Sequence, residues 1–395
     1  MKKPAPKRSA CPGAPAAACP GAVHAAKGHA SKADRLMRSL PAVQPWIPRP
    51  GMTIEDLVDG FSARGAFNGG RLGEACRLYE HIARTKATVA VTLAGALIPA
   101  GLGGTLIRLM EMGFVDCIIS TGANIYHDLH FALGMPVAQG DFRADDEELA
   151  KDGVVRIYDV FITEKVLLDT DLYLRRIFES TPATGPLSSA RLHRLIGQRL
   201  LEDAPNAAHS FVATAARLGV PIYTSSPGDS SVGMNLAGVK FDGGTLTVDP
   251  DLDVLETCAI VAEAEQNAVI MLGGGSPKNF YLQTQPMLWQ ILGVNKGGHD
   301  YFVQLTTDSP HWGGLSGATP QEAVSWGKVK PGQLKNNIVV YSCATVTAPI
   351  LFSYVISRCK ARKPKRLMDR IDESLAALRK ATGRKRKPGA AGKGM

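Results

Sequence analysis

Short apolar segments alternate with helix-forming segments between residues 88 and 342, and this alternation constrains the fold more than any other sequence feature. Segments such as 88–93 (TVAVTL) and 268–272 (AVIML) are apolar throughout, as strands buried inside a parallel sheet are. The candidate strands are 88–93, 115–120, 221–224, 268–272, 301–306 and 337–342. Strands separated by helices predict an α/β fold: a doubly wound, Rossmann-like, mostly parallel sheet flanked by helices.

Composition divides the 395 residues into one folded body and two basic tails. Residues 1–45 are rich in Ala, Pro, Gly and Lys without apolar periodicity, which predicts a disordered arm. Residues 46–360 have the composition of a single globular domain, and 45% of the chain is hydrophobic, enough for a full core. Residues 361–395 form a basic tail in which 367–378 is a candidate helix and the remainder is expected to be disordered.

The net charge of +9 is unevenly distributed. Residues 1–45 contain eight Lys or Arg and one acidic residue, and residues 358–395 contain fourteen against three, so the body between them is acidic. An acidic body argues against a nucleic-acid enzyme and suits the attraction of a cationic small substrate. The R-K-R-K run at 384–387 is typical of a solvated tail, with nucleic-acid or acidic-surface binding as the minority interpretation.

The sequence predicts a cytoplasmic protein without membrane contact or a bound metal. No apolar run approaches the ~20 residues of a membrane helix, and the N-terminus lacks the apolar core of a signal peptide. Seven cysteines occur without a C-x-x-C pair, and the odd number argues against a disulfide framework. Cys11 and Cys19, with His24 and His29 downstream, match no zinc spacing.

Polar or glycine-rich loops follow several candidate strands. Carboxyl ends of parallel strands share one edge of a sheet, where ligands bind, so we expect these loops to converge on one crevice. They are residues 95–104, 121–128, 225–233 and 273–276. In the last, Gly273–Gly275 precedes Ser276 as a candidate N-cap, which offers backbone N–H groups to a phosphate, although the spacing is not G-x-G-x-x-G. Asp229 could bind a ribose hydroxyl or an amine, or its side chain could hold its own turn together. His127 could belong to the ligand site, or it could be a capping or core histidine.

A further loop and helix, residues 313–328, contain a candidate reactive amine. Three glycines precede Thr319 as predicted N-cap, and Glu322 is placed to complete a capping box. Gly327 should end this short helix directly before Lys328. An ammonium near Trp326 at the mouth of a glycine loop is a candidate for an amine tuned for chemistry; the alternative is a solvated lysine after a buried tryptophan.

Four of these motifs together resemble the deoxyhypusine synthase family over residues 46–358. They are E-A-V-S-W-G-K at 322–328, G-G-G-x-x-K at 273–278, S-T-G at 120–122 and G-D-S-S-x-G at 228–233. The resemblance implies an NAD-dependent catalytic domain that transfers an aminobutyl group from a polyamine such as spermidine, through a lysine Schiff base, to an acceptor amine. It also implies a homotetramer with active sites between paired subunits.

The resemblance assigns roles residue by residue. Lys328 would form the Schiff base, Trp326 would make a cation–π contact with the polyamine, and Glu322 would pair with an ammonium. The residues that would line the NAD site are Thr121, Gly122, Asp229, Gly273, Gly274, Gly275 and Ser316.

Several positions depart from the family pattern. Asn279 stands in place of a histidine, and Leu315 and Met234 each stand in place of an acid in the polyamine site. The pair Tyr126–His127 replaces two glutamates, with His127 as a candidate general base, and Cys343 replaces an acid expected near the cofactor.

These departures change the set of groups that would pair with an amine while keeping the Schiff-base lysine. The leading hypothesis is therefore that the acceptor is a free diamine such as putrescine, which would give homospermidine. One alternative is a true deoxyhypusine synthase that modifies a lysine of a translation factor. Another is a catalytically silent protein that binds NAD or polyamine.

Overall fold

The computed structural model describes residues 31–182 and 185–383, and the chain forms two compact units, residues 1–42 and 43–395. The described part of the first unit contains helix α1 (Lys32–Ser39), which has no buried residue. A capping box between Ser31 and Asp34 closes its first turn, so part of the segment expected to be a disordered arm is helical. The rest of that arm, with Cys11, Cys19, His24 and His29, lies outside the described residues.

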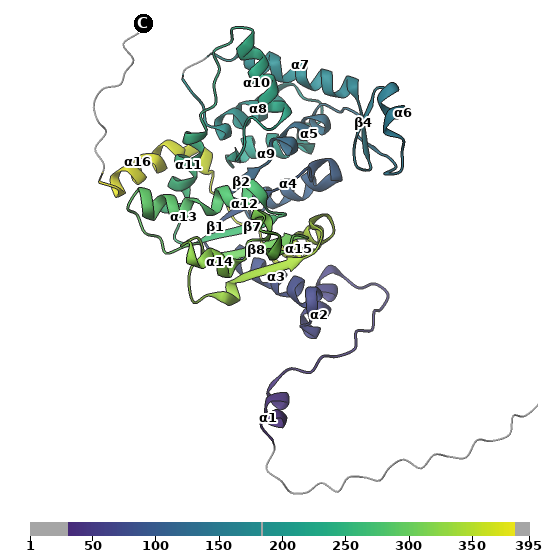
Figure 1. Cartoon of the computed structure of the whole chain (residues 1–395), viewed down its shortest axis with the longest axis vertical. Coiled ribbons are helices and arrows are strands. Elements are labelled where there is room, and N and C mark those ends of the chain that lie inside the picture. The colour runs from purple at the N-terminus through teal and green to yellow at the C-terminus, as the bar shows by residue number, and fades with distance from the viewer. Residues whose placement is uncertain (1–30, 183–184, 384–395) are drawn as a thin grey trace, which may run out of the picture. The chain divides into compact units, whose positions relative to one another are not determined.

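A six-stranded parallel sheet forms the centre of the second unit (Figure 1). Its strands are β1 (Thr88–Leu93), β2 (Cys117–Ser120), β6 (Ile222–Thr224), β7 (Asn267–Leu272), β8 (Tyr301–Thr306) and β9 (Asn337–Tyr341). The spatial order is β6-β2-β1-β7-β8-β9, with every neighbouring pair parallel. All six candidate strands and the doubly wound fold are confirmed. The chain order reverses between β1 and β7, the switch point where such sheets bind ligands.

Hydrophobic side chains from both faces of the sheet enter two separate core clusters. Val89 and Val91 of β1 belong to one cluster, and Ala90 between them belongs to the other, because successive strand residues point to opposite faces. The first cluster includes residues of α3 (Phe67–Arg84), α4 (Gly103–Glu111) and α15 (Ala344–Arg358); the second includes residues of α11 (Pro250–Glu263), α12 (Gly275–Leu282) and α16 (Ile371–Ala381). Burial on both faces explains why β1 consists of apolar and β-branched residues.

All four of the expected loops are partly helical, since α4 also begins at Gly103 and α12 at Gly275. Helix α5 (Gly122–Ala132) begins directly after Thr121, and helix α10 (Ser231–Phe241) takes up the end of the 225–233 segment. The polar residues that suggested a loop in α5 have distant partners: Asn124 bonds to Gly95 and Ile98, and buried Asp128 accepts hydrogen bonds from the start of α9 (Phe211–Leu218). Their polarity serves tertiary contacts rather than solvent exposure.

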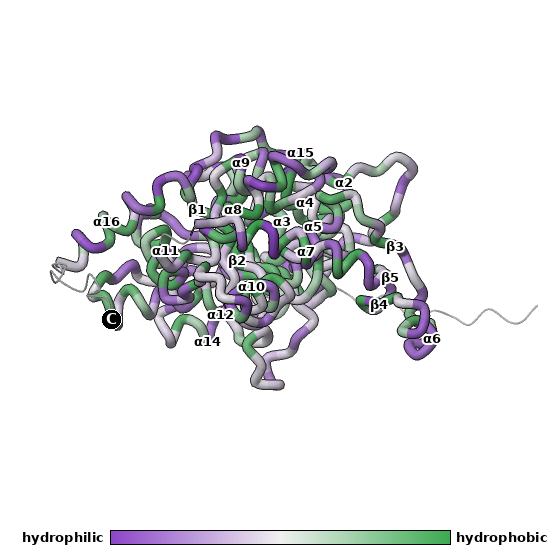
Figure 2. Tube along the Cα trace, turned by 90° about the horizontal axis from the view of Figure 1, so that it is seen from above, coloured by the Kyte–Doolittle hydropathy of each residue, from purple (hydrophilic) through white to green (hydrophobic). Residues whose placement is uncertain are grey.

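A small antiparallel sheet lies at the margin of the second unit, where α6 marks it in Figures 1 and 2. It comprises β3 (Ala138–Gln139), β5 (Val160–Thr163) and β4 (Val154–Ile157), with α6 (Asp146–Lys151) preceding β4. The remaining longer helices are α2 (Ile54–Arg64), α7 (Glu164–Ser180) and α8 (Ser189–Asp203). None of the helices in the described part of the chain is both long and apolar enough to cross a membrane.

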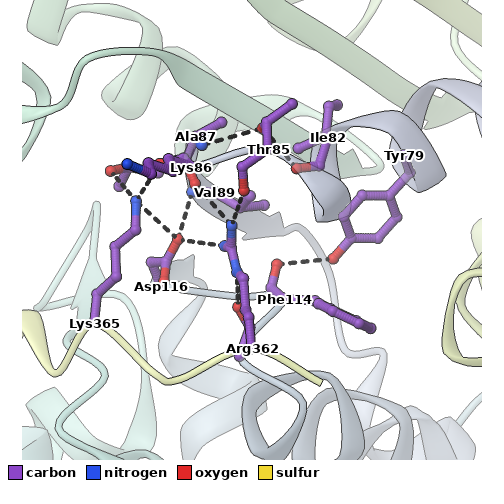
Figure 3. Close-up of polar contacts among 12 residues, drawn as sticks. Tyr79, Ile82, Thr85, Lys86, Ala87, Val89, Phe114, Asp116, Arg362 and Lys365 are labelled. Carbon is purple, nitrogen blue, oxygen red and sulfur yellow. Dashed lines mark hydrogen bonds and ion pairs between the residues drawn. The ribbon is translucent and has the colours of Figure 1, made fainter. Parts of the chain in front are cut away.

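The segment after residue 360 departs from the expected tail (Figure 3). Arg362 forms an ion pair with buried Asp116 at 2.9 Å and donates to the carbonyls of Thr85 and Ala87. Lys365 donates to the Lys86 carbonyl, and α16, the expected helix at 367–378, packs on α11. The folded unit therefore includes residues 361–383, because these cations meet a carboxylate and carbonyls at the amino ends of β1 and β2. Residues 384–395 lie outside the described part.

Candidate active site

The loops after β6, β7 and β8 meet at the carboxyl edge of the sheet. The hydroxyls of Ser226 and Ser276 lie 3.4 Å apart and link the first two loops. The backbone N–H of Gly275 donates to Ser316 Oγ at 2.9 Å, which links the second to the third. These contacts bring together loops that are separated by up to about ninety residues, as the strand-end pattern predicted.

The loops after β1 and β2 meet at the same edge. Thr121 Oγ1 donates to the Gly95 carbonyl at 2.6 Å. A Cβ on Gly122 would lie 2.2 Å from Ser230 Oγ, so the start of α5 approaches the loop after β6 closely enough to need a glycine. Asp229 in that loop is exposed; its backbone N–H bonds to the Ser226 carbonyl, while its carboxylate makes none of the described hydrogen bonds.

The glycine loop at 273–275 needs glycine for two different reasons. Gly273 and Gly275 have φ values of 78° and 59°, in the left-handed region. A Cβ on Gly274 would lie 2.4 Å from Ser316 Cα, so this glycine allows two backbones to approach. Gly274, and not the expected Ser276, is the N-cap of α12. The side-chain cap comes instead from Ser316, whose hydroxyl accepts the Gly275 N–H.

Helix α14 (Pro320–Ser325) places Lys328 beyond a sharp stop, as predicted. Thr319 Oγ1 accepts a hydrogen bond from the Glu322 N–H at 3.1 Å, and Gly327 has a φ of 67°. Only this half of the expected capping box forms, because no described hydrogen bond returns from the Glu322 side chain to Thr319. Instead, the charge of the carboxylate acts on Lys278 and Lys328, where it partly opposes the lowering of their pKa values by burial.

Lys328 is half-buried and directed into the protein. Its Nζ donates to Asn279 Oδ1 at 2.9 Å and lies 5.7 Å from the Trp326 ring centroid. Burial lowers the pKa of Lys328, and the Glu322 carboxylate partly opposes this. Because Trp326 is 59% exposed, the alternative of a solvated lysine after a buried tryptophan is wrong. The arrangement favours a neutral, nucleophilic amine more than a surface lysine would.

No described contact brings His127 to Lys328. Its ring lies against those of Tyr126 and His130 inside α5, and its Nδ1 is buried without a hydrogen-bond partner. Burial lowers the pKa of His127 to about 4, which makes it a weak base at neutral pH. The Tyr126 hydroxyl bonds to Asp171 of α7. His127 is therefore a partly buried core residue, which is one of the interpretations expected from the sequence.

Leu315 borders a cavity of about 430 Å³ next to the catalytic candidate. Asn279, the hydrogen-bond partner of Lys328, also lines this cavity, together with Phe280 and Met287. None of the described lining residues carries an ionisable side chain. Met234 is 68% exposed on α10 and is not among the residues that line the cavity.

Cys343 is exposed at the N-terminus of α15, and its hydrogen bond with Thr345 lowers the pKa of the thiol. Among the described residues, no group of histidine, cysteine and carboxylate side chains could hold a metal ion.

Two further residues of this site, Lys278 and Gln304, lack an assigned role in the sequence-based prediction. Lys278 is 2% exposed, and its Nζ donates to Gln304 Oε1 at 3.0 Å. It also donates to the carbonyls of Ser316 and Ala318 at 3.2 and 2.7 Å. The G-G-G-x-x-K spacing marks Lys278, but the partners that make its burial tolerable come from distant segments.

Comparisons with known proteins identify the family of this chain. The sequence model of the family described as deoxyhypusine synthase matches residues 56–355. A "deoxyhypusine synthase-like protein" of Nostoc punctiforme is 45% identical over 338 residues, covering 83% of this chain and 86% of the relative. A "probable deoxyhypusine synthase 2" of Methanosarcina acetivorans is 39% identical over 302 residues, covering 76% and 85%.

A solved structure supports the fold independently. The crystal structure of a "putative deoxyhypusine synthase" from Entamoeba histolytica has a TM-score of 0.53 and 17% identity, and covers 79% of this chain and 96% of that one. At that identity the likeness concerns the fold alone. The family match over most of the chain and the relatives at 45% and 39% identity establish that this chain belongs to the deoxyhypusine synthase family.

Proposed function

We propose that the protein is an NAD-dependent transferase that moves an aminobutyl group from a polyamine such as spermidine to an acceptor amine through a Schiff base on Lys328. The observation that carries this proposal is the half-buried Lys328 amine, held by Asn279 and with a lowered pKa, in a member of this family. A Schiff-base lysine must attack as the neutral amine, and partial desolvation raises the neutral fraction at working pH.

The residues around Lys328 would bind and orient the donor. The exposed Trp326 ring can hold a polyamine ammonium by cation–π attraction, and Glu322 can pair with another. NAD would take a hydride from the donor carbon and later return it. The Lys328 amine then adds to the resulting imine carbon and displaces diaminopropane. The acceptor amine adds in turn and releases Lys328, so the lysine is regenerated.

The edge of the sheet fits a dinucleotide. It lies at the switch point between β1 and β7, and the glycines at 273 and 275 leave the backbone open. The residues that would hold NAD are Thr121, Gly122, Asp229, Gly273, Gly274, Gly275 and Ser316. The Asp229 carboxylate, exposed and without a described hydrogen bond, is suited to a ribose hydroxyl. The Gly275 N–H is taken by Ser316, so phosphate binding would rely on neighbouring groups.

The acceptor in this proposal is a free diamine such as putrescine, which gives homospermidine. Support comes from the changed set of pairing residues, because Lys328 is kept while Leu315, Met234 and Asn279 are uncharged. The cavity beside Lys328 has no ionisable side chain among its described lining residues and offers no partner to an ammonium, so the family's usual pairing of amines must differ in this chain. His127 stays a candidate base only. The proposal includes the homotetramer that the family resemblance implies, which sedimentation analysis tests.

The test offers the purified full chain NAD and spermidine with either putrescine or the lysine-bearing translation factor. We expect homospermidine and diaminopropane in a one-to-one ratio by mass spectrometry, and no modified protein lysine. Modification of the protein lysine alone would show that the proposed diamine acceptor is wrong, while the proposed transfer reaction would still hold. Absence of any diaminopropane would favour the third hypothesis, a silent binding protein.

A further inference from the structure

The cavity beside Lys328 continues from Asn279 along α12 to the end of that helix. Asn279 Oδ1 accepts a hydrogen bond from Lys328 Nζ at 2.9 Å, and Asn279 and Gln283, the C-cap of α12, both line the cavity of about 430 Å³. Residues four apart lie on one side of a helix, about 6 Å apart along its axis. A substrate that reacts at Lys328 can therefore extend past Asn279 and place its far end beside Gln283.

Two side-chain amides provide uncommitted hydrogen-bonding groups in this cavity. The hydroxyls of Thr257 and Thr284, which also line it, each donate to a backbone carbonyl at 2.7 Å. In the described part of the chain, by contrast, no hydrogen bond involves Asn279 Nδ2 or the exposed amide of Gln283. Asn279 Nδ2 can donate, and the Gln283 amide can both donate and accept. Together they complement a group that has one N–H and one carbonyl, such as an amide.

The rest of the cavity is unsuited to a second ammonium. Most of its remaining wall is apolar, with the side chains of Val254, Phe280, Met287 and Leu315, and none of the described lining residues is ionisable. An ammonium that enters this space loses hydration without gaining a carboxylate. An amide loses less, because neutral donors and acceptors can replace its water. The cavity therefore favours an amine whose far end is an amide over one whose far end is charged.

The side chains that would hold the donor are not part of this cavity. Glu322 and Trp326, which would bind the ammonium groups of the polyamine, are not among the residues that line it. The cavity can therefore receive the far end of the acceptor, while the reactive amine of the acceptor lies beside Asn279 and Lys328.

We propose that the cavity selects an acceptor whose far end is an acylated amine, that is, a mono-N-acyl diamine, and that Gln283 recognises its amide. This inference rests on the proposed transfer through Lys328 and names the substrate class of that site. The free amine of the acyl diamine adds to the imine carbon on Lys328 and displaces the lysine amine. The hydride removed earlier from the donor then reduces the new imine. The amide keeps all its bonds, and putrescine is a weaker acceptor at the same site.

The binding test compares three amines that share one carbon chain and differ at the far end. N-acetylputrescine has an amide there, putrescine an ammonium and butylamine a methyl group. Isothermal titration calorimetry of the full chain, with and without NAD, measures their Kd values. We expect N-acetylputrescine to bind about fivefold more tightly than either of the others. Tighter binding of putrescine would overturn the preference for a neutral end, and equal binding of butylamine would overturn the recognition of the amide.

A carboxylate introduced into the cavity should reverse this preference. Gln283→Glu keeps the shape of the side chain and adds a charge, so we expect putrescine to bind about fivefold more tightly than N-acetylputrescine. Leu315→Asp adds a charge to the same cavity and should act in the same direction if Gln283→Glu does not fold. Gln198→Glu, the control, makes the same charge change at an exposed position of α8 outside the cavity and should keep the wild-type order. An unchanged order in Gln283→Glu would overturn the inference.

A transfer assay separates this inference from the proposed function. The full chain receives NAD, spermidine and either acceptor, and mass spectrometry identifies the products. We expect aminobutyl transfer to N-acetylputrescine with a kcat/KM about fivefold above that for putrescine. Conversion of putrescine by a protein that neither binds nor converts N-acetylputrescine would overturn the inference and leave the proposed function in place. Absence of transfer, with the binding order and its reversal as expected, would support the cavity assignment and overturn the proposed reaction.

Discussion

Two side chains, together with burial, set the position and the pKa of the Lys328 amine. Asn279 fixes the position of the amine, burial lowers the Lys328 pKa, and Glu322 opposes that shift. This balance leaves a group that can act both as a nucleophile and as a neighbour of cationic substrates. An amine with a lowered pKa next to a carboxylate indicates an amine-binding active site more strongly than either residue alone.

A substitution at Glu322 should separate substrate binding from amine activation. In Glu322→Gln, the pKa of Lys328 should fall further, because the carboxylate that raises it is gone. Acetylation of Lys328 by an amine-reactive reagent, followed by mass spectrometry over a series of pH values, should therefore reach its half-maximal rate at a lower pH. The KM for spermidine should rise about two- to fivefold, because one exposed ion pair is lost. A KM that stays at the wild-type value would show that Glu322 does not bind the polyamine.

At the level of elements, apolar runs predict strands well and polar runs predict loops poorly. Five of the six strands are buried at every position, and only β9 buries every second residue, so their sequences alone identify them. Residues 121–128 look like a loop because Asn124 and Asp128 are polar, yet both are buried in α5. Apart from Thr121, which accepts from Asn124, their hydrogen-bond partners lie between 26 and 84 residues away in the chain, so the local sequence does not reveal them.

The same limit applies to the candidate site. Thr319, Gly327 and Lys328 follow from local rules of helix capping and termination, and the structure confirms that helix. The burial of Lys278 depends on carbonyls 38 and 40 residues away, which no local pattern predicts. His127 shows that a local pattern can also suggest a site residue wrongly, because this histidine near a strand end packs against Tyr126 and His130.

At the level of the whole molecule, the two edges of the central sheet have different roles. Candidate ligand-binding loops occupy the carboxyl edge, and the C-terminal segment crosses the amino edge beside Asp116 (Figure 3). Asp116 is 2% exposed, and burial raises its pKa although Arg362 and Lys365 lower it. Its pairing with a residue 246 positions away ties the end of the chain to β1 and β2.

Removal of the Arg362 guanidinium should therefore destabilise the protein strongly. Arg362→Met leaves the buried Asp116 carboxylate with the Val89 N–H and, as its one remaining described ion-pair partner, Lys365 at 3.8 Å. We expect a loss of about 3 kcal/mol in the free energy of unfolding. Urea unfolding measures this. Arg143→Met, which breaks a surface pair with Asp141, is the control and should change stability by less than about 0.5 kcal/mol. Equal losses in the two variants would contradict a structural role for the Arg362 pair.

The central claim, that Lys328 is the nucleophile, is tested most directly by trapping its Schiff base. The full chain is incubated with NAD and spermidine, reduced with borohydride, digested and analysed by mass spectrometry. We predict an aminobutyl adduct on Lys328 that is absent in Lys328→Ala and retained in Lys330→Ala, whose lysine pairs with Asp300. An adduct on another lysine, or none in a protein that binds both ligands, would contradict the account.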